Sequence, residues 1–346
     1  MSKSQVFIPL NSMILQHNYP LHMLNTFGLS VQAEYFARFQ CIEELQNLLA
    51  QAERPLMILG GGSNILLTQD VKGSILKNEI GGINIIEEDD RSALVKVGGG
   101  VVWHDFVMWS INKQLGGIEN LSLIPGSVGA APMQNIGAYG AEIKSVFEEL
   151  ESVHIDSREV KIFNNEDCQF GYRYSIFKGE LKGQFVICSV NFRLSKIPQF
   201  NTSYGAIEDE LKAMGATASL ESVSQAVIAI RQRKLPNPKD IGNSGSFFKN
   251  PTISNAQFES LKSEFPNIVG YPNGQNKTKL AAGWLIEQAG WKGYTHQDAG
   301  VHKNQALVLV NYGQAKGQDI LKLSQDIQAS IQQKFGIALE AEVNII

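Results

Sequence analysis

The sequence predicts an α+β fold, because strands that end in glycine turns alternate with helices before a strand-rich middle segment. Two short apolar runs end in glycines: Leu56–Leu59 enters Gly60–Gly62, and Leu94–Val97 enters Gly98–Gly100. Apolar runs that stop at glycines are typical of buried strands followed by tight turns. The segment from 145 to 195 alternates apolar and polar residues, as half-buried strands do.

Helices are predicted where apolar residues recur with a period near 3.6. The predicted helices cover Ile42 to Leu49, Val102 to Leu115, 221–234, 279–289 and 318–335, the last with one apolar stripe: Ile320, Leu323, Ile327, Ile331 and Phe335. Further strands are predicted at 152–155 and 159–162 as a hairpin, and at 185–194, 305–311 and 339–346. In the last of these, Glu342 would face opposite to Val343 and Ile345. Ordered loops are expected at 234–245 and 266–276.

Composition is that of a globular protein. The chain has 346 residues, 43% of them hydrophobic and 18% charged, with a net charge of −4, which predicts two or three domains. No basic run indicates nucleic acid as a partner. The three cysteines lack the spacing of a metal site, so we expect reduced thiols and no metal. No apolar run approaches the roughly 20 residues that span a bilayer, so we expect no membrane association and a cytoplasmic location.

The glycine runs do not match the common nucleotide-binding motifs. A G-x-G-x-x-G pattern would need a third glycine where Ile65 stands, and the second run has Trp103 at that position. The sequence contains no G-x-x-x-x-G-K-[ST] either. Taken alone, each run is explained by a tight turn.

A longer loop system from Ile124 to Gly140 is richer in possible ligand contacts. Its prolines and glycines fix turns and permit close backbone approach, while Ser127, Gln134 and Asn135 supply neutral hydrogen-bonding groups. Backbone N–H groups in such loops form concavities that bind anions. A pyrophosphate would fit this chemistry.

Five further segments extend this pattern into a resemblance. The chain reads NTFG from Asn25, ILGGGSN from Ile58, FGYRYSIFK from Phe170, GSFFKNP from Gly245 and LEAEV from Leu339. Together with IPGSVGAAPMQNIGAYG at 124–140, they resemble the motifs of the UDP-N-acetylenolpyruvoylglucosamine reductase family. Ala341 departs from the family's more familiar LEPEV. No catalytic group is lost.

The resemblance implies a two-part FAD-binding fold of the vanillyl-alcohol-oxidase or p-cresol-methylhydroxylase type, followed by an α/β substrate domain. The implied domains are residues 1–80 joined by strand 339–346, residues 81–220, and residues 221–338. FAD would be bound noncovalently, because the first loop offers no His for attachment. The implied cofactor residues are Gly60, Gly61, Gly62, Ser63, Asn64, Pro125, Gly126, Ser127, Gly129, Ala130, Gln134, Asn135, Gly137, Ala138, Tyr139 and Gly140.

The resemblance also implies a reaction and its catalytic residues. NADPH would reduce FAD, and flavin N5 would pass hydride to UDP-N-acetylglucosamine enolpyruvate, giving UDP-N-acetylmuramate for peptidoglycan synthesis. Arg173 and Glu342 would stabilise the enolate, and Ser246 would donate the proton. Taken alone, Arg173 would be read as a salt-bridge residue, Ser246 as a turn residue and Glu342 as solvated. Their joint occurrence in three motifs favours catalysis.

These roles agree with the chemistry of an enol ether conjugated to a carboxylate. Hydride addition at the methylene carbon pushes negative charge toward the carboxylate, and a rigid guanidinium such as that of Arg173 can meet this charge. An ionised Glu342 would repel the enolate, so we favour its protonated form, with orientation of Arg173 as the alternative.

Substrate contacts follow from the same resemblance. The implied substrate-binding residues are Tyr172, Tyr204, Lys234, Asn250 and Gln305. We expect a monomer whose partners are the nucleotide sugar and NADPH. Two alternatives stay open from the residues: a flavin oxidase that uses oxygen, and a nucleotide-sugar-binding protein without activity.

Overall fold

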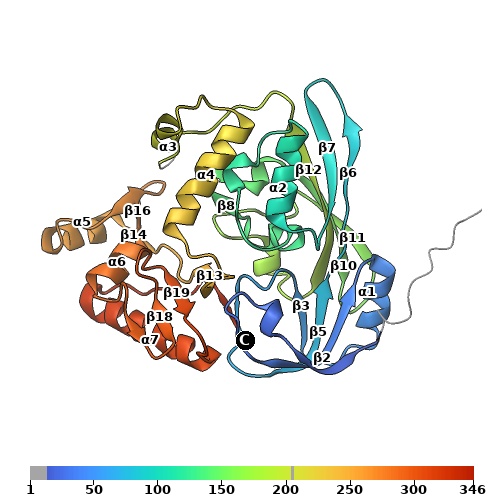
Figure 1. The fold of residues 1–346 in the computed structure, drawn as a ribbon, viewed down its shortest axis with the longest axis horizontal. Helices are drawn as coiled ribbons and strands as arrows, with labels where there is room; N and C mark the ends of the chain where they lie inside the picture. The colour runs from blue at the N-terminus through green and yellow to red at the C-terminus, as the bar shows by residue number, and fades with distance from the viewer. Residues whose placement is uncertain (1–13, 204–205) are drawn as a thin grey trace, which may run out of the picture. The chain divides into compact units, whose positions relative to one another are not determined.

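The computed structural model describes residues 14–203 and 206–346 (Figure 1). The chain divides into two compact units. Among the described residues, the first contains 14–19, 33–61, 72–203 and 206–231, and the second contains 20–32, 62–71 and 232–346. The three-domain division expected from the resemblance is drawn along other boundaries and stays a prediction.

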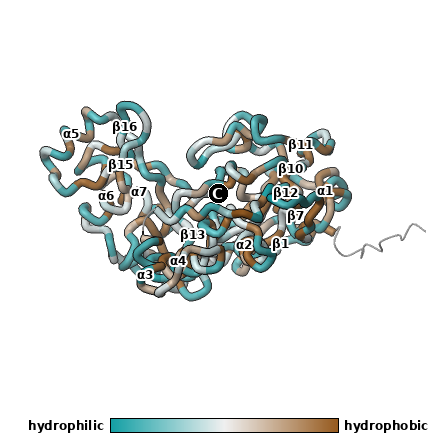
Figure 2. Tube along the Cα trace, turned by 90° about the horizontal axis from the view of Figure 1, so that it is seen from above, coloured by the Kyte–Doolittle hydropathy of each residue, from teal (hydrophilic) through white to brown (hydrophobic). Residues whose placement is uncertain are grey.

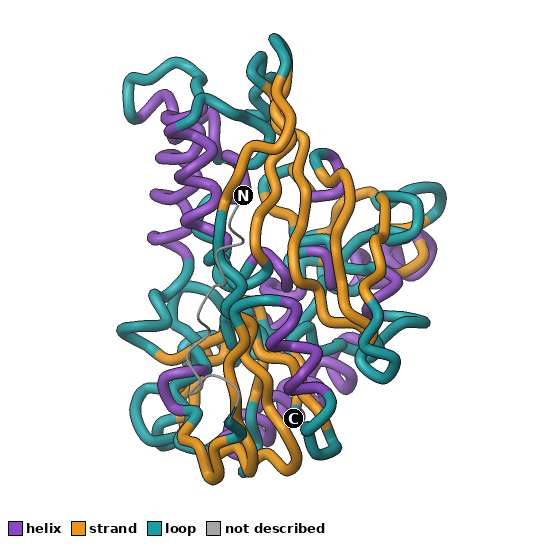
Figure 3. The backbone as a smooth tube through the Cα atoms, turned by 90° about the vertical axis from the view of Figure 1, so that its right-hand side faces the viewer, coloured by secondary structure: helices purple, strands orange, loops and turns teal. Residues whose placement is uncertain are grey.

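The larger sheet of the first unit has five antiparallel strands in the order β11-β10-β12-β7-β6 (Figure 3). Their bounds are Val160–Asn164, Phe147–His154, Phe185–Ser195, Ser92–Gly98 and Ile83–Glu88, respectively. The predicted hairpin is confirmed as β10 and β11. The central strand β12 is buried along most of its length, and Figure 2 shows hydrophobic segments around β7 and β12.

Aromatic packing joins a helix to this sheet. Helix α2 (Trp103–Asn112) and helix α4 (Leu220–Lys234) lie on the same side of it in Figure 1. The Trp103 ring is fully buried, with its centroid 5.8 Å from those of Phe106 and Phe192 in edge-on geometry. Such pairs add to the stabilisation that burial of the ring area provides. The start of α2 is therefore rigidly held.

The smaller sheet of the first unit has the order β1-β2-β5-β3, and helix α1 (Ile42–Leu49) belongs to the same unit. The strands span Gln16–Pro20, Gln32–Phe39, Val71–Asn78 and Leu56–Leu59. Strands β3 and β5 are parallel, and Phe39, Leu45 and Leu76 share their core. Both α1 and β3 were predicted from the sequence, and both are confirmed.

In the second unit, two larger sheets and three helices accompany the two-stranded sheet of β4 (Ile65–Leu66) and β20 (Asn344–Ile345). One sheet has the order β13-β19-β18-β17, with bounds Gly242–Ser246, Val308–Asn311, Ala299–Val301 and Thr295–His296. The other has the order β14-β16-β15, with bounds Thr252–Ser254, Lys277–Leu280 and Gly270–Pro272. The helices are α5 (Asn255–Glu264), α6 (Ala282–Gln288) and α7 (Gly317–Phe335). Helix α7 packs on β18 and β19, and its predicted apolar stripe is buried at every position.

Shorter elements complete the fold. The remaining strands are β4 (Ile65–Leu66), β8 (Gly137–Ala138), β9 (Ala141–Glu142) and β20 (Asn344–Ile345), and the remaining helix is α3 (Ile207–Ala213). Single 3₁₀ turns occur at His22–Leu24, Glu119–Leu121, Val128–Ala130, Pro132–Gln134, Ile143–Ser145 and Ile176–Lys178. In the described part of the chain, no helix is both long and apolar enough to cross a bilayer.

Three sequence predictions need correction. The helix expected from 279 begins at Ala282, because Lys277–Leu280 pairs with strands on both sides as β16. The loop expected at 266–276 contains β15. The predicted tail strand is reduced to β20, and Ile345 is 44% exposed although Val343 is 4% exposed.

Candidate functional site

The first glycine loop follows β3 and lies directly against the second loop. A Cβ atom on Gly61 would stand 2.8 Å from the Cα of Gly126, and one on Gly60 would stand 2.6 Å from the Oγ of Ser127. Both distances are shorter than a carbon atom tolerates. The loops approach this closely only because these positions carry no side chain.

A lysine stands beside the first loop. The Nζ of Lys77, in β5, donates a hydrogen bond of 3.3 Å to the carbonyl of Gly60. Burial lowers the pKa of Lys77, while Glu79 opposes this effect and Arg38 adds to it. An ammonium group is thus held at the end of β3.

The second loop rests on the glycines that follow β7. The Gly129 N–H donates to the Gly99 carbonyl at 2.8 Å, and the Gly99 N–H donates to the Cys188 carbonyl at 2.7 Å. A Cβ atom on Gly129 would lie 3.0 Å from the carbonyl oxygens of both Gly99 and Ile187. The Gly98–Gly100 run therefore serves as a support for the second loop.

The first turn of α2 holds the segment that leads into the second loop. The Trp103 backbone N–H donates to the Gly126 carbonyl, and its indole N–H donates to the Leu121 carbonyl, each at 3.0 Å. The neighbouring His104 accepts the backbone N–H of Leu123 on Nδ1 at 3.0 Å. Leu123 has a φ of 59°, a conformation that is costly for a leucine.

Two predicted cofactor residues use their side chains to tie the second loop to neighbouring segments. Asn135 is fully buried, and its amide nitrogen donates to Glu142 Oε2 and to the Gly171 carbonyl, each at 3.0 Å. The Gln134 Oε1 accepts from the Lys178 ammonium at 3.0 Å. These two side chains stabilise the loop.

Arg173 lies beside the second loop in the first unit. Its backbone φ is 53°, and its guanidinium donates to the Gly137 carbonyl at 2.7 Å. The guanidinium carbon lies 5.5 Å from the ring centroid of Tyr172, which is 51% exposed. A cation is thereby placed against the edge of the predicted flavin loop.

Arg231 is a candidate site residue that the sequence analysis did not single out. Its Nε is buried and has no hydrogen-bond partner. Burial lowers the pKa of this guanidinium, Tyr139 opposes the shift and Arg173 adds to it. Such a donor is available to a hydrogen-bond acceptor from outside the protein chain, a ligand or a water molecule. The available signal was its place on α4, four residues after the buried Val227.

In the second unit, a β-bulge positions Ser246. Asn243 pairs with Val310 and Ser246 pairs with Val308. Two residues of β13, Ser244 and Gly245, therefore stand opposite one residue of β19, Leu309. Between them Gly245 has a φ of +72°, which glycine adopts without strain. Bulges of this kind re-aim the side chain that follows them.

Glu342 is held next to the serine strand. Its N–H donates to the carbonyl of Phe247, the residue after Ser246, at 2.8 Å. The Nδ2 of Asn64, at the end of the first glycine loop, donates to the Glu342 carbonyl at 3.3 Å. The second unit therefore brings together three of the predicted site residues: Asn64, Ser246 and Glu342.

Two predicted substrate residues meet at the start of α6. The Oδ1 of Asn250 accepts the N–H of Ala282 at 3.0 Å. The Oε1 of Gln305 accepts the N–H of Leu307 at 3.3 Å and would lie 3.2 Å from a Cβ atom on Gly283. Both amides therefore have one end fixed by backbone.

The other predicted substrate residues are placed separately. Lys234 is the last residue of α4. Tyr204 lies outside the described residues. Arg173 and Tyr172 belong to the first unit, whereas Ser246, Glu342, Asn250 and Gln305 belong to the second.

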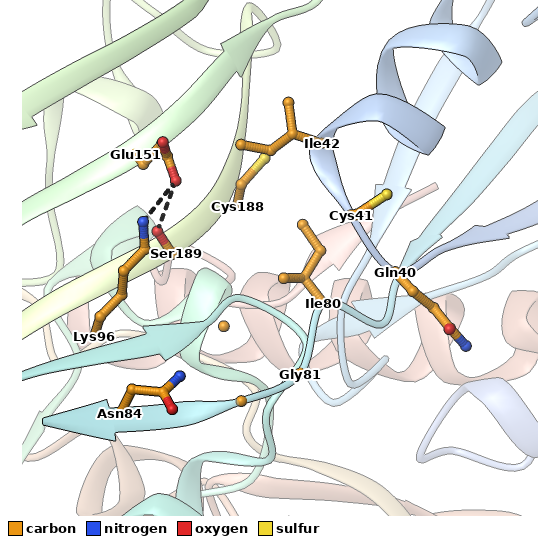
Figure 4. Close-up of a pocket in the computed structure, with 12 residues that line it drawn as sticks. Gln40, Cys41, Ile42, Ile80, Gly81, Asn84, Lys96, Glu151, Cys188 and Ser189 are labelled. Carbon is orange, nitrogen blue, oxygen red and sulfur yellow. Dashed lines mark hydrogen bonds and ion pairs between the residues drawn. The ribbon is translucent and has the colours of Figure 1, made fainter. Parts of the chain in front are cut away.

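A cavity of about 270 Å³ in the first unit is lined by none of the predicted site residues. In Figure 4, Lys96, Glu151 and Ser189 point toward one another, with the Glu151 Oε2 3.0 Å from the Lys96 Nζ and 3.2 Å from the Ser189 Oγ. Burial raises the pKa of Cys188 to about 12, so this thiol is not reactive. Over the described ranges, no cluster of His, Cys, Asp or Glu could hold a metal ion.

Comparison with known proteins places this geometry in a class. A model described as an FAD binding domain matches residues 33–162. This match covers the β3 loop, the Gly98–Gly100 support and most of the larger sheet. The chain is thus a flavoprotein with mixed helices and strands, and the predicted fold class is confirmed.

The family follows from the rest of the chain. A model described as UDP-N-acetylenolpyruvoylglucosamine reductase, C-terminal domain, matches residues 237–346. Relatives named UDP-N-acetylenolpyruvoylglucosamine reductase, from Flavobacterium johnsoniae and Amoebophilus asiaticus, are each 50% identical over 96% of this chain and 100% of their own. The chain belongs to the UDP-N-acetylenolpyruvoylglucosamine reductase family, which makes it an oxidoreductase.

A solved structure agrees in fold. The UDP-N-acetylenolpyruvylglucosamine reductase of Thermus caldophilus matches with a TM-score of 0.67 at 22% identity, covering 96% of this chain and 99% of that one. The family predicted from six motifs is confirmed, as is FAD binding. The individual site residues stay predictions.

The contact between the two glycine loops can be tested by Gly61→Ala. The added methyl would push the Gly126 backbone away, so we expect a loss of about 1–3 kcal/mol in the free energy of unfolding and weaker FAD binding. Chemical unfolding and FAD titration would measure both. Gly81→Ala is the matched control, because a Cβ atom there would have nothing within 4 Å. Equal stability of the two variants would contradict the loop contact.

Proposed function

We propose that this protein uses NADPH and noncovalent FAD to reduce UDP-N-acetylglucosamine enolpyruvate to UDP-N-acetylmuramate, a step of peptidoglycan precursor synthesis. The relatives' shared name and the six matched motifs support this substrate. The observation that carries the proposal is the hydrogen bond from the Glu342 N–H to the Phe247 carbonyl. This bond holds Glu342 beside the end of β13, the strand that carries Ser246.

The residues of the first unit fit FAD. The two glycine-rich loops, which are in backbone contact, can offer N–H groups to a pyrophosphate. The unpartnered Nε of Arg231 can donate a hydrogen bond to an acceptor on the cofactor. The first loop, Gly60 to Asn64, contains no His, which supports noncovalent binding. We assign flavin binding to residues 1–80 with 339–346 and to 81–220, and substrate binding to 221–338.

Bound FAD would supply hydride, taken from NADPH, to the terminal methylene carbon of the substrate. The Arg173 guanidinium would then stabilise the negative charge that develops on the substrate carboxylate. Ser246 would deliver its hydroxyl proton to the carbon next to that carboxylate. Glu342 would act together with Arg173 in stabilising the enolate.

The remaining contacts complete the proposal. Lys234, Asn250 and Gln305 would bind the diphosphate and sugar of the substrate, with Tyr172 and Tyr204 at its rim. The amides of Asn250 and Gln305 are suited to this, because one end of each is already fixed by backbone. We further propose a cytoplasmic monomer.

An anaerobic absorbance titration would test the reaction. The flavin band should bleach when NADPH is added and return when the enolpyruvyl nucleotide sugar is added. A band that returns only with oxygen would favour an oxidase instead. Protein that stays colourless after FAD is added would refute the proposal.

Ser246→Ala should separate the two half-reactions. We expect NADPH to bleach the flavin at nearly the normal rate, and reoxidation by substrate to slow by about two to four orders of magnitude, because only carbon protonation needs the hydroxyl. Stopped-flow absorbance would measure both rates. Ser244→Ala is a matched control, since that buried hydroxyl lies on the same strand and has no hydrogen-bond partner. Normal turnover of Ser246→Ala would remove the serine from the mechanism.

Arg173→Lys should raise the barrier of the second half-reaction by about 2–4 kcal/mol, because a point charge replaces a planar fork of donors. The measurement is kcat/KM for the nucleotide sugar. Arg193→Lys provides the control, since Arg193 pairs with Glu148 on the surface at 3.1 Å. Unchanged efficiency in Arg173→Lys would exclude its proposed role.

A further inference from the structure

The segment between Leu121 and Gly126 is held from two helices. Trp103 on α2 binds the carbonyls at both ends of this segment. On the other side, the Ser122 Oγ lies 2.8 Å from the Ser224 Oγ of α4, both of them buried. The backbone N–H of Leu123 donates to the Nδ1 of His104 at 3.0 Å.

Leu123 is the residue of this segment that most needs an external partner. Its φ of 59° is a conformation that leucine rarely adopts, and it directly precedes the Ile124-Pro125-Gly126 turn. Proline restricts the residue before it to extended backbone. A change in the backbone conformation of Leu123 would therefore displace Gly126, which contacts Gly61.

We propose that His104 is a positioning residue for the flavin loop, acting as a neutral Nδ1 acceptor that fixes Leu123 and, through it, Pro125 to Ser127. This inference rests on the proposed binding of FAD by that loop. His104 itself would touch neither the cofactor nor the substrate. The ring must carry its proton on Nε2, because Nδ1 accepts the Leu123 N–H.

The charges around His104 favour this neutral form. Burial lowers the pKa of the imidazole; Asp105 on the same helix opposes the shift, and Arg231 on α4 adds to it. A His with a depressed pKa in the folded protein contributes stability that is present above about pH 6.5 and is lost as pH falls through the folded pKa. Protonation would also place N–H against N–H at Leu123.

A direct contact between His104 and FAD would give the opposite pH dependence of FAD affinity. If His104 bound the pyrophosphate as a cation, acid would strengthen FAD binding. If it acts as the acceptor for Leu123, acid must weaken FAD binding, because the protonated ring can no longer accept. The pH dependence of affinity therefore separates positioning from direct charge contact.

The test is the dissociation constant of FAD from the full-length protein between pH 5 and pH 8, measured by quenching of flavin fluorescence. His104→Phe removes the acceptor and should raise the dissociation constant about tenfold at pH 7.5. His104→Asn keeps an oxygen near the Nδ1 position and cannot titrate, so it should bind FAD nearly normally at pH 7.5 and without the acid weakening of the wild type.

His154→Asn is the matched control, because His154 also accepts a backbone N–H on Nδ1, from Ser157 at 3.1 Å, in the β10–β11 hairpin. It should leave the acid weakening unchanged. Equal affinity of His104→Phe and wild type, or stronger binding in acid that His104→Asn abolishes, would overturn the inference. Wild-type protein that binds no FAD at any pH would instead refute the proposed function. Circular dichroism and thermal unfolding confirm that each variant is folded.

Discussion

Backbone contact between glycines organises the first unit. A Cβ atom on Gly61 would stand 2.8 Å from the Cα of Gly126, and one on Gly129 would press at 3.0 Å on the carbonyl oxygen of Gly99. The glycine runs Gly60–Gly62 and Gly98–Gly100 lie at the ends of strands β3 and β7. The start of α2 holds the second loop, which contains Gly126, through Trp103. These loops are thus built from the ends of buried elements. Loops of this kind can present N–H groups to a ligand because their geometry does not depend on side-chain rotamers.

In the second unit, backbone geometry positions single side chains. The bulge at Gly245 sets the direction of Ser246, and the hydrogen bond from Glu342 to Phe247 sets the register of the tail. A slip of one residue would turn Glu342 to the other face. Asn64, bound to the Glu342 carbonyl, fixes that register from a segment far away in sequence.

Local pattern predicted the elements that obey it, and tertiary pairing decided the rest. The apolar stripe of α7 and the apolar run of β3 could be read directly, because their burial has a regular period. Lys279 and Leu280 were assigned to the helix predicted at 279–289, because they continue into the apolar pattern of α6, whereas their strand partners lie elsewhere in the chain. The motifs pointed to Arg173, Ser246 and Glu342. Arg231 and His104 stayed hidden, because their importance lies in an absent partner and in a backbone contact, which a sequence does not display.

The cations of the first unit have a consequence for the protein without its cofactor. The Nε of Arg231 is buried, and burial together with the like charge of Arg173 lowers the pKa of this guanidinium. Charged groups in such surroundings raise the free energy of the folded chain unless something compensates them. A neutral His104 avoids adding a third positive charge. An electron-rich ligand would offset the repulsion, and its binding free energy would appear as stability of the folded protein.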